Sequence, residues 1–268
     1  MAFTKEQLTR YSRHFVMPEI GVKGQKALQN ARVLVIGAGA LGSVSLMYLA
    51  AAGVGTIGVA DSDKVELSNL HRQLIHRTGT VGESKLLSAK KTMEEINPDC
   101  NVILHEGFVT PKNIIDIIKD YDFIIDGTDR FETKFLINDA CVLAEKPFVH
   151  AGIVRFGGQA MTYVPHKSPC LRCVLGGIPK GNEQTCSQVG VVGAAVGVLG
   201  SIQALETIKY ITGAGELLTG RVMHFDGLKM KFNEIGNIPM DNGCKICGEN
   251  LEIKDLFTDD YTVECKIG

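Results

Sequence analysis

The sequence has almost no net charge. Its 28 lysines and arginines nearly balance 30 aspartates and glutamates, which leaves a formal charge of −2 over 268 residues. A chain without a charge excess has no long-range field that attracts nucleic acid or an anionic membrane, so neither is expected as the main partner. Charged residues make up 22% and hydrophobic residues 45% of the chain, which excludes a disordered protein.

The chain also lacks the patterns of export and of membrane insertion. Its amino terminus is charged from Lys5 onward and has no apolar segment typical of a secretory signal, so we expect a cytoplasmic protein. Residues 33–60 and 185–205 carry no charge and are long enough to span a bilayer. Glycines break the first stretch into short elements and polar residues open the second, so we expect no membrane span.

Eight cysteines are too few for a disulfide scaffold in a chain of this size. Four of them form two Cys-x-x-Cys pairs separated by 70 residues: Cys170 with Cys173, and Cys244 with Cys247. Brought together, they supply the four thiolates of a structural, tetrahedral Zn²⁺ site, which leaves no position for water. A redox dithiol or a disulfide in each pair is the alternative. Both pairs sit among Pro, Gly and Lys residues typical of loops, which favours zinc.

A glycine-rich segment follows the first expected strand, residues 32–36. It contributes four residues that would surround a phosphate: Gly37, Gly39, Ala40 and Gly42. A helix at about 43–52 and a strand at 56–60 follow, and Asp61 comes 19 positions after the third glycine. In such a unit the glycines let phosphate approach the helix amides and the carboxylate binds the ribose. We therefore expect an adenine-nucleotide site.

Strands and helices alternate through the first half of the chain and hairpins follow in the second. Further helices are expected at 4–15, 22–30, 85–96, 132–145 and about 189–211, and one more begins at Thr110. Further strands are expected at 102–105, 122–125, 148–154 and 159–164, with a hairpin at 221–235 split by Asp226-Gly227. The fold class is thus α/β: a Rossmann-like doubly wound sheet, parallel in its first half, with antiparallel strands added in the second half and a zinc-tied loop.

The segment after Asp61 favours an ATP-dependent enzyme over a dehydrogenase. It carries acids, amides and cations in close succession: Asp63, Ser68, Asn69, Arg72 and Gln73. Lys85 opens the next helix, and Asp129 follows the fourth strand, at the edge where open α/β sheets bind ligands. Together with Arg13, this set suits a triphosphate with Mg²⁺ better than a dinucleotide. The chain has no P-loop, H-E-x-x-H or G-x-S-x-G motif, so hydrolytic functions lack support.

The chain resembles the ThiF/MoeB/HesA family, bacterial relatives of the ubiquitin-activating enzymes. The matching motifs span nearly the whole sequence: residues 10–13, the glycine segment, 61–73, Lys85, 127–129, both cysteine pairs and 197–206. The family adenylates the carboxy-terminal glycine of a ubiquitin-like sulfur-carrier protein with ATP and Mg²⁺ and releases pyrophosphate. The resemblance therefore implies an adenylyltransferase of thiamine, molybdopterin or related biosynthesis.

The resemblance also implies a role for each matching residue. Asp61 contacts the ribose, Asp129 positions Mg²⁺, and Arg13 reaches the site from the partner subunit of a homodimer. The phosphates are surrounded by Ser68, Asn69, Arg72, Gln73 and Lys85. A carboxylate is already a nucleophile, so such a site needs no general base. Its task is to bring two anions together and to stabilise charge in the transition state.

Cys186 is a further candidate. We expect it at the start of the long apolar helix, where the helix dipole favours the thiolate. In similar proteins a cysteine here bonds to the carrier's sulfur or acyl group, and a loop cysteine without catalytic role is the alternative. Two residues depart from the family pattern. Ala40 stands where glycine is common but still fits a helix start. Arg130 follows Asp129 where asparagine is usual, and its role stays open.

We expect one continuous domain, residues 1–268, because the chain shows no internal repeat and no low-complexity linker. Its parts are N-terminal helices (1–30), a nucleotide-binding half (31–150), a carrier-binding half with the cysteine pairs (151–247) and an unassigned tail (248–268). Some longer family members carry a rhodanese domain that this sequence lacks, so the resemblance implies a separate sulfur-donor protein.

Three other functions are weighed against the adenylyltransferase. A nicotinamide-dependent oxidoreductase is favoured by the glycine segment alone. A non-catalytic zinc-tied binding partner is disfavoured because Arg13, Arg72, Lys85 and Asp129 are all present. A tRNA-modifying dehydratase is disfavoured by the balanced charge and by the paired cysteine motifs. His150, His166 and His224 are interpreted as ordinary polar or strand-end positions.

Overall fold

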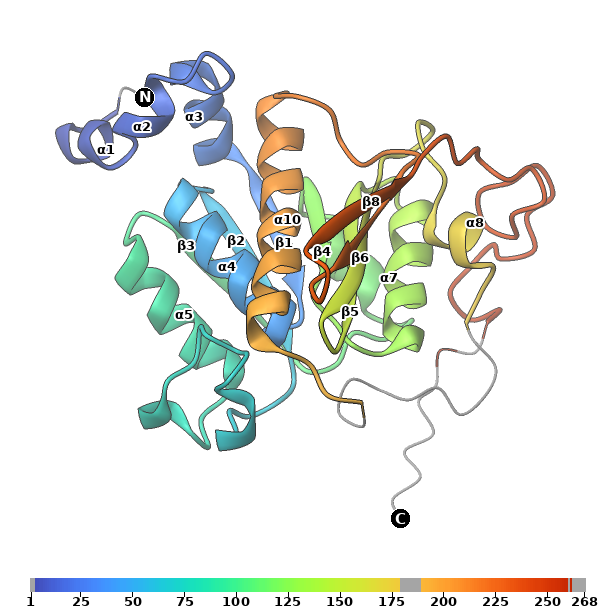
Figure 1. The fold of residues 1–268 in the computed structure, drawn as a ribbon, viewed down its shortest axis with the longest axis horizontal. Coiled ribbons are helices and arrows are strands. Elements are labelled where there is room, and N and C mark those ends of the chain that lie inside the picture. The colour runs from blue at the N-terminus through green and yellow to red at the C-terminus, as the bar shows by residue number, and fades with distance from the viewer. Residues whose placement is uncertain (1–2, 179–188, 260, 262–268) are drawn as a thin grey trace.

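The chain folds around one eight-stranded sheet with the strand order β3-β2-β1-β4-β5-β6-β7-β8 (Figure 1). The computed structural model describes residues 3–178, 189–259 and 261. The strands are β1 (Arg32–Ile36), β2 (Thr56–Asp61), β3 (Asn101–Glu106), β4 (Phe123–Asp126), β5 (Phe148–Val154), β6 (Gly157–Tyr163), β7 (Val222–Asp226) and β8 (Lys231–Ile235). The order places β1 and β4 side by side at the centre.

The described helices are α1 (Lys5–Arg10), α2 (Ser12–Phe15), α3 (Gly21–Asn30), α4 (Ala40–Ala52), α5 (Lys85–Ile96), α6 (Ile114–Ile118), α7 (Phe131–Leu143), α8 (Leu171–Leu175) and α10 (Gly193–Thr212). Two short 3₁₀ turns, η1 (Leu67–Asn69) and η2 (Thr78–Thr80), lie between β2 and α5. None of the helices in the described part of the chain is long and apolar enough to cross a membrane.

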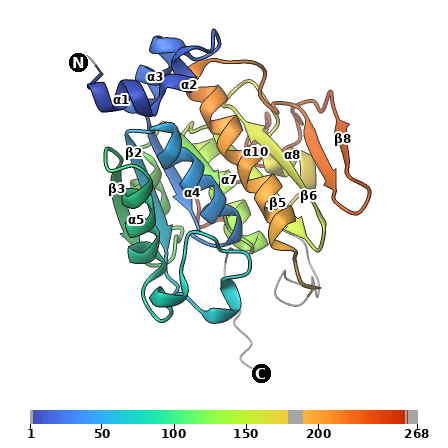
Figure 2. The ribbon, with the colours of Figure 1, turned by 60° about the vertical axis from the view of Figure 1, so that its left-hand side comes forward.

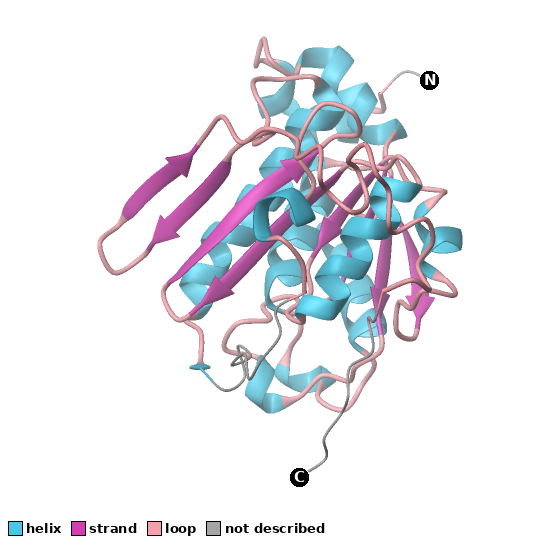
Figure 3. Ribbon diagram, turned by 90° about the vertical axis from the view of Figure 1, so that its right-hand side faces the viewer, coloured by secondary structure: helices cyan, strands magenta, loops and turns pink. Residues whose placement is uncertain are grey.

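The strand directions confirm the predicted fold class. β3, β2, β1, β4 and β5 run parallel, whereas β6, β7 and β8 each pair antiparallel with the strand before them. The central strands are apolar along their length because both faces are covered: Val33, Leu34 and Val35 are fully buried. β8, at the outer edge, is exposed at all five residues (Figure 3).

Helices cover both faces of the sheet. α4, α5 and α10 lie on one face (Figure 2), and α6, α7 and α8 lie on the other. α4 and α10 run side by side, and their close packing depends on Gly200. A Cβ added to Gly200 would lie 2.7 Å from the Cβ of Val44. The carboxyl ends of the parallel strands are thereby left open between the two helical layers.

Three predicted boundaries are wrong. The helix expected at 4–15 is broken at Tyr11. α6 begins at Ile114 rather than at Thr110, and residues 111–113 form a turn before it. α10 begins at Gly193 rather than near residue 189, because Gly190 has φ +82°. The backbone next to Gly190 instead forms an isolated bridge, between Val191 and Arg155 in the turn that follows β5.

The tail after residue 247, which had no assignment, packs onto the domain. Ile253 and Leu256 are buried in the same core as α6, α7 and α8. Arg172 pairs with the buried Asp139 at 2.6 Å and with Asp259 at 2.5 Å, and the Tyr261 hydroxyl donates to Asp139. Apolar burial and ion pairs thus attach the described part of the tail to the face that carries α7 and α8.

Candidate nucleotide site and metal centre

The turns after β1 and β4 meet at the lower edge of Figure 1, where they form a glycine cradle. Gly37 has φ +99°, and a Cβ added there would lie 2.8 Å from Gly127 O. A Cβ added to Gly42 would lie 1.8 Å from Gly37 O. These positions require glycine because the backbones touch. Gly39 differs, since a Cβ there would be 3.8 Å from its nearest neighbour, Gln73 Nε2. The space beside Gly39 can therefore admit a ligand.

Asp61 fixes the cradle from the end of β2. Its Oδ2 accepts from the Ala38 amide at 2.7 Å, and its Oδ1 accepts from the Asp63 amide at 2.8 Å. At the carbonyl of the same residue, His76 Nε2 lies 3.0 Å from Ala38 O and donates to it. Both polar groups of Ala38 are thus held in place. A ribose would bind to the remaining lone pairs of Asp61.

Cations and amides predicted at the phosphates come together beside the cradle. Lys85, the first residue of α5, has a side chain only 6% exposed and pairs with Asp63 at 2.8 Å. Arg72 donates to Ser68 O at 3.0 Å and to Asn69 Oδ1 at 3.4 Å. The Ser68 hydroxyl itself donates to Glu66. The chain therefore keeps both cations close to η1 and to the start of α5.

Gln73 carries a polar atom without a partner. Its side chain is buried, and its Oε1 has no hydrogen bond within the described residues. A buried amide group without a partner costs free energy, which a ligand at this place would recover. Because Gln73 also faces Gly39, the unpaired amide group points to the same space that the glycine leaves open.

The start of α10 supports the Arg72 segment. A Cβ added to Gly193 would lie 2.4 Å from His71 O and 3.3 Å from Arg72 Cα. The helix terminus thus rests directly on the backbone that carries the arginine. Gly197, one turn further along α10, has no neighbour within 4 Å of an added Cβ.

Asp129 follows β4 and is exposed, as is Arg130, the residue before α7. No hydrogen bond or ion pair of the Asp129 carboxylate occurs within the described residues. The carboxylate is therefore available to a cation beside the glycine cradle. The side chain of Arg130 does not cap α7.

Sequence reasoning missed a buried ionic cluster directly behind this turn. Asp126 Oδ2 lies 3.0 Å from Lys134 Nζ and 2.8 Å from His150 Nδ1. Gln203 of α10 donates to Asp126 O at 2.7 Å. A signal was present at His150 and Gln203, which are polar positions within a largely apolar strand and helix. His150, interpreted as an ordinary polar or strand-end position, lies within β5 and is buried against Asp126.

Burial sets the protonation states in this region. It lowers the pKa of His150 and of His76 below the ordinary 6.5, so both rings are neutral at neutral pH. Burial alone would raise the pKa of Asp126, but Lys134 and His150 outweigh it and hold that pKa well below its usual range.

These shifts predict that stability falls as the pH drops. The unfolded chain protonates His76 and His150 near pH 6.5, whereas the folded chain does so only at lower pH. The full contribution of these two histidines to the free energy of unfolding is therefore present above about pH 7. The free energy of unfolding decreases as the pH falls below that value, and His150 accounts for at most about 1.4 kcal/mol per pH unit of this decrease. Urea unfolding between about pH 8 and about pH 5 measures this slope. His76→Gln should flatten it, because the side chain at position 76 then no longer titrates. A pH-independent free energy of unfolding would contradict the prediction.

Arg13 lies at the opposite end of the molecule from the cradle of its own chain. The preceding Tyr11 packs on Gly53, where an added Cβ would lie 2.6 Å from the Tyr11 ring. Gly53 ends α4, and Gly39 caps its start. A helix of this length places Gly53 about 20 Å from Gly39. Within one chain, the structure does not bring Arg13 to the other predicted site residues.

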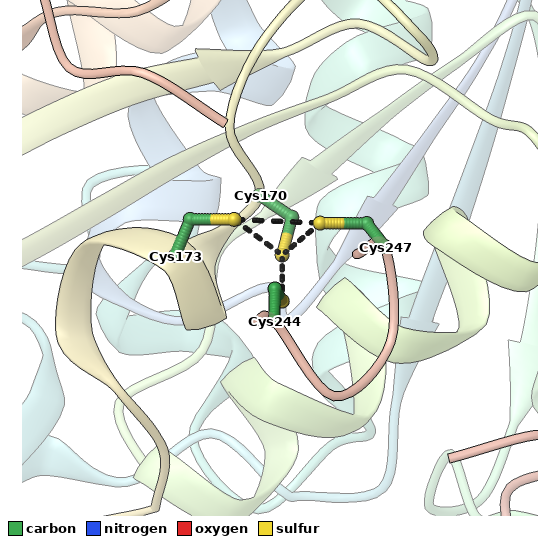
Figure 4. A group of neighbouring side chains, drawn as sticks. All are labelled: Cys170, Cys173, Cys244 and Cys247. Carbon is green, nitrogen blue, oxygen red and sulfur yellow. Dashed lines mark hydrogen bonds between the residues drawn. The ribbon is translucent and has the colours of Figure 1, made fainter. Parts of the chain in front are cut away.

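The four paired cysteines form one cluster, as predicted (Figure 4). Their sulfurs all lie within 4.8 Å of one another, with Cys173 to Cys247 at 3.4 Å and Cys170 to Cys244 at 3.7 Å. Thiolates around one tetrahedral zinc ion are about 3.8 Å apart, and bonded sulfurs are about 2.05 Å apart. The spacing fits a shared metal ion and excludes disulfides within the cluster. Cys186 lies outside the described residues.

A Rossmann-like sheet with this cradle and a four-cysteine centre defines a nucleotide-binding α/β protein. The model of the ThiF family matches residues 11–246, and the chain belongs to that family. It is 47% identical over 239 residues to a probable adenylyltransferase/sulfurtransferase MoeZ of Mycobacterium tuberculosis. This alignment covers 87% of this chain and 61% of the relative. It is 42% identical over 262 residues to adenylyltransferase and sulfurtransferase MOCS3 of Dictyostelium discoideum, covering 97% of this chain and 61% of the relative.

Solved structures agree on the fold. E. coli MccB with ATP superimposes with a TM-score of 0.77 at 24% identity, over 89% of this chain and 73% of that chain. PaaA gives a TM-score of 0.76 at 22% identity, over 89% and 76%. The chain spans about three fifths of the length of the curated relatives.

Proposed function

We propose that the protein is an ATP-dependent adenylyltransferase that activates the C-terminal glycine of a ubiquitin-like sulfur-carrier protein, for sulfur transfer in thiamine, molybdopterin or related biosynthesis. The observation that carries the proposal is the convergence of the glycine cradle, Lys85, Arg72 and the exposed Asp129 at one edge of the sheet. Two curated relatives bear the name adenylyltransferase.

In the proposed reaction a carboxylate oxygen of the carrier attacks the α-phosphorus of ATP. The new bond to phosphorus forms as the bond from the α-phosphorus to the bridging oxygen breaks, and pyrophosphate leaves. Lys85 and Arg72 neutralise the phosphate oxygens, while Asn69 and Gln73 supply amide hydrogen bonds. Asp61 holds the cradle and accepts from the ribose. No side chain has to remove a proton, because the attacking carboxylate is already ionised.

The residues present suit the two metal ions that the proposal requires. The free carboxylate of Asp129 is a hard oxygen ligand, and Mg²⁺ held there with ATP would supply charge neutralisation at the phosphates. Cys170, Cys173, Cys244 and Cys247 would hold Zn²⁺ in a structural role. Thiolate ligands and ATP use both suit a reducing compartment, so we propose a cytoplasmic location.

We further propose a homodimer in which Arg13 completes the partner's site. The distance of Arg13 from its own cradle supports this arrangement, because a cation about 20 Å away cannot reach the phosphates. The sulfur would come from a separate donor protein. The carrier would dock on the antiparallel half, residues 151–247, and Cys186 would be the candidate for covalent contact with it.

Mixing two inactive variants tests the placement of Arg13. Arg13→Ala and Asp129→Ala should each be inactive, because the first lacks a cation at the phosphates and the second lacks the carboxylate that would hold Mg²⁺. If Arg13 acts across the interface, hybrid dimers regain one complete site. A random mixture of subunits should then recover about a quarter of the wild-type rate of ATP–pyrophosphate exchange. If Arg13 acted within its own chain, mixing would restore nothing.

A second variant tests the support of Arg72 by α10. Gly193→Ala should push the Arg72 segment away and weaken ATP binding by about tenfold, measured by calorimetry. Gly197→Ala is the matched control, because it adds the same methyl group on the same helix where nothing lies within 4 Å. An equal loss of ATP affinity in both variants would show that a change in α10 itself, rather than in its contact with the Arg72 segment, weakens ATP binding.

ATP–pyrophosphate exchange tests the function itself. The purified protein is offered candidate carriers that end in Gly-Gly, one at a time. Exchange with one carrier would establish adenylation and name its pathway. ATP binding without exchange would favour a non-catalytic binding partner, and binding of a nicotinamide dinucleotide instead of ATP would favour an oxidoreductase.

A further inference from the structure

The turn that carries Asp129 is held by the buried cluster behind it. Thr128 precedes Asp129 directly, and its amide and hydroxyl both donate to Asp126 Oδ1, at 3.1 Å and 2.6 Å. Its carbonyl accepts from Lys134 Nζ at 2.7 Å. Thr128 is therefore tied on both sides. The Asp129 side chain has no such tie within the described residues, so the backbone alone determines its position.

Lys134 uses all of its hydrogen-bond donors inside the protein. An ammonium group has three donors. Lys134 directs them to Asp126 Oδ2 at 3.0 Å, Thr128 O at 2.7 Å and Ala151 O at 2.9 Å. Its side chain is 6% exposed. It is thus unavailable to a phosphate, although it lies only five residues after Asp129. Its bonds connect α7, the turn after β4, and β5.

Burying this charged cluster costs free energy, so it is an inefficient way to stabilise the fold. Asp126 and Lys134 carry opposite charges within the core, while His150 stays neutral and donates its Nδ1 hydrogen to Asp126. Burial removes both ions from water, and well-packed apolar residues commonly stabilise a core as well as a buried ion pair does. An ion pair fixes direction and distance, which apolar contacts do not.

We propose that the Asp126–Lys134–His150 cluster is a positioning device that sets the Asp129 carboxylate for a divalent cation bound together with the nucleotide. The inference rests on the proposed function. The cluster touches neither the nucleotide nor the cation. It acts through Thr128, whose three ties define where the following residue can lie.

Metal binding, measured without turnover, tests this role. Mn²⁺ is titrated onto the full chain in the presence of α,β-methylene-ATP and followed by electron paramagnetic resonance. Lys134→Met should weaken Mn²⁺ binding about tenfold, because the tie to Thr128 O is lost. Lys134→Arg keeps the charge and donors and should restore affinity to within about threefold of the wild type. The affinity of Lys134→Met for α,β-methylene-ATP in the absence of metal should differ from that of the wild type by less than about twofold.

Two further variants separate positioning from stability. Lys146→Met is the matched control, since Lys146 Nζ donates to Lys119 O at 2.7 Å and to Tyr121 O at 2.9 Å, at the other end of β4. It should lower the urea midpoint and leave Mn²⁺ affinity unchanged. The double variant of Asp126→Asn with Lys134→Met removes both charges, so the fold is retained. It should still bind Mn²⁺ weakly.

The outcomes distinguish this inference from the function on which it rests. Wild-type Mn²⁺ affinity in the folded double variant, or an equal loss of affinity in Lys146→Met, would overturn the positioning role. If the wild type bound Mn²⁺ with the analogue, lost that affinity in Lys134→Met and yet catalysed no exchange with any carrier, the proposed function would fail and the positioning role would stand.

Discussion

Replacement of Asp129 by alanine is expected to lower the rate of ATP–pyrophosphate exchange by about 10²–10³. The side chain is exposed beside the glycine cradle and is the carboxylate there without a partner in the described residues. Its removal would take away the ligand that would hold Mg²⁺, so the negative charge of the phosphates would be less well compensated when carrier and ATP come together. The loss should appear in the maximal rate and in the dependence on Mg²⁺ concentration, both measured with saturating carrier.

The fold should survive this substitution. An exposed side chain without contacts contributes less than about 0.5 kcal/mol to the free energy of unfolding. Asp120→Ala is the matched control, because Asp120 is likewise exposed but lies at the other end of β4. An Asp129→Ala protein that exchanges pyrophosphate at the wild-type rate would remove Asp129 from the site.

Loss of one cluster thiolate is the second large effect that we expect. Cys244→Ser should abolish stoichiometric zinc binding and lower the free energy of unfolding by more than about 4 kcal/mol, since a metal ion held by the four cysteines would join α8 to residues 244–247. For a chain of this length, the melting temperature should fall by about 10 °C or more. Metal analysis by mass spectrometry and thermal unfolding followed by circular dichroism measure the two quantities.

A different buried cysteine controls for the chemical change. Cys100→Ser also places a hydroxyl in the core, but Cys100 lies outside the cluster, under α5. It should retain one zinc ion per chain despite some loss of stability. Should Cys244→Ser keep its zinc and melt with the wild type, the four sulfurs would not be a zinc site.

The strand–helix units were predictable because their signals are local. α5 matches its predicted range, 85–96, since Ser84 caps it and accepts from the Leu86 amide at 3.2 Å. The start of α6 was not predictable from Thr110 and Pro111 alone. The Thr110 amide donates to Asn113 Oδ1 as in a capping box, yet residues 111–113 form a turn and the helix begins at Ile114. A capping pattern states a preference, and the neighbouring side chains decide between a turn and a helix.

The candidate site was predictable only in part, for a related reason. Motif spacing indicated Lys85, Arg72 and Asp129, which lie in or directly after the segments that follow β2 and β4. It could not indicate the Asp126 cluster. That cluster joins residues from β4, α7, β5 and α10, and no sequence spacing encodes contacts between four separate elements. It could not place Arg13 either, because the position depends on which end of α4 the amino terminus reaches.

The contact between Gly37 and Gly127 has a mechanical consequence. With backbone against backbone, the turn that would receive the nucleotide and the turn that would receive the cation cannot slide or open independently. The two turns therefore form one rigid unit. The segment between β2 and α5 that carries Arg72 is joined to the same unit, because His76 Nε2 donates to Ala38 O and Gly193 lies against His71 O. A nucleotide would therefore meet a site whose backbone is already in place.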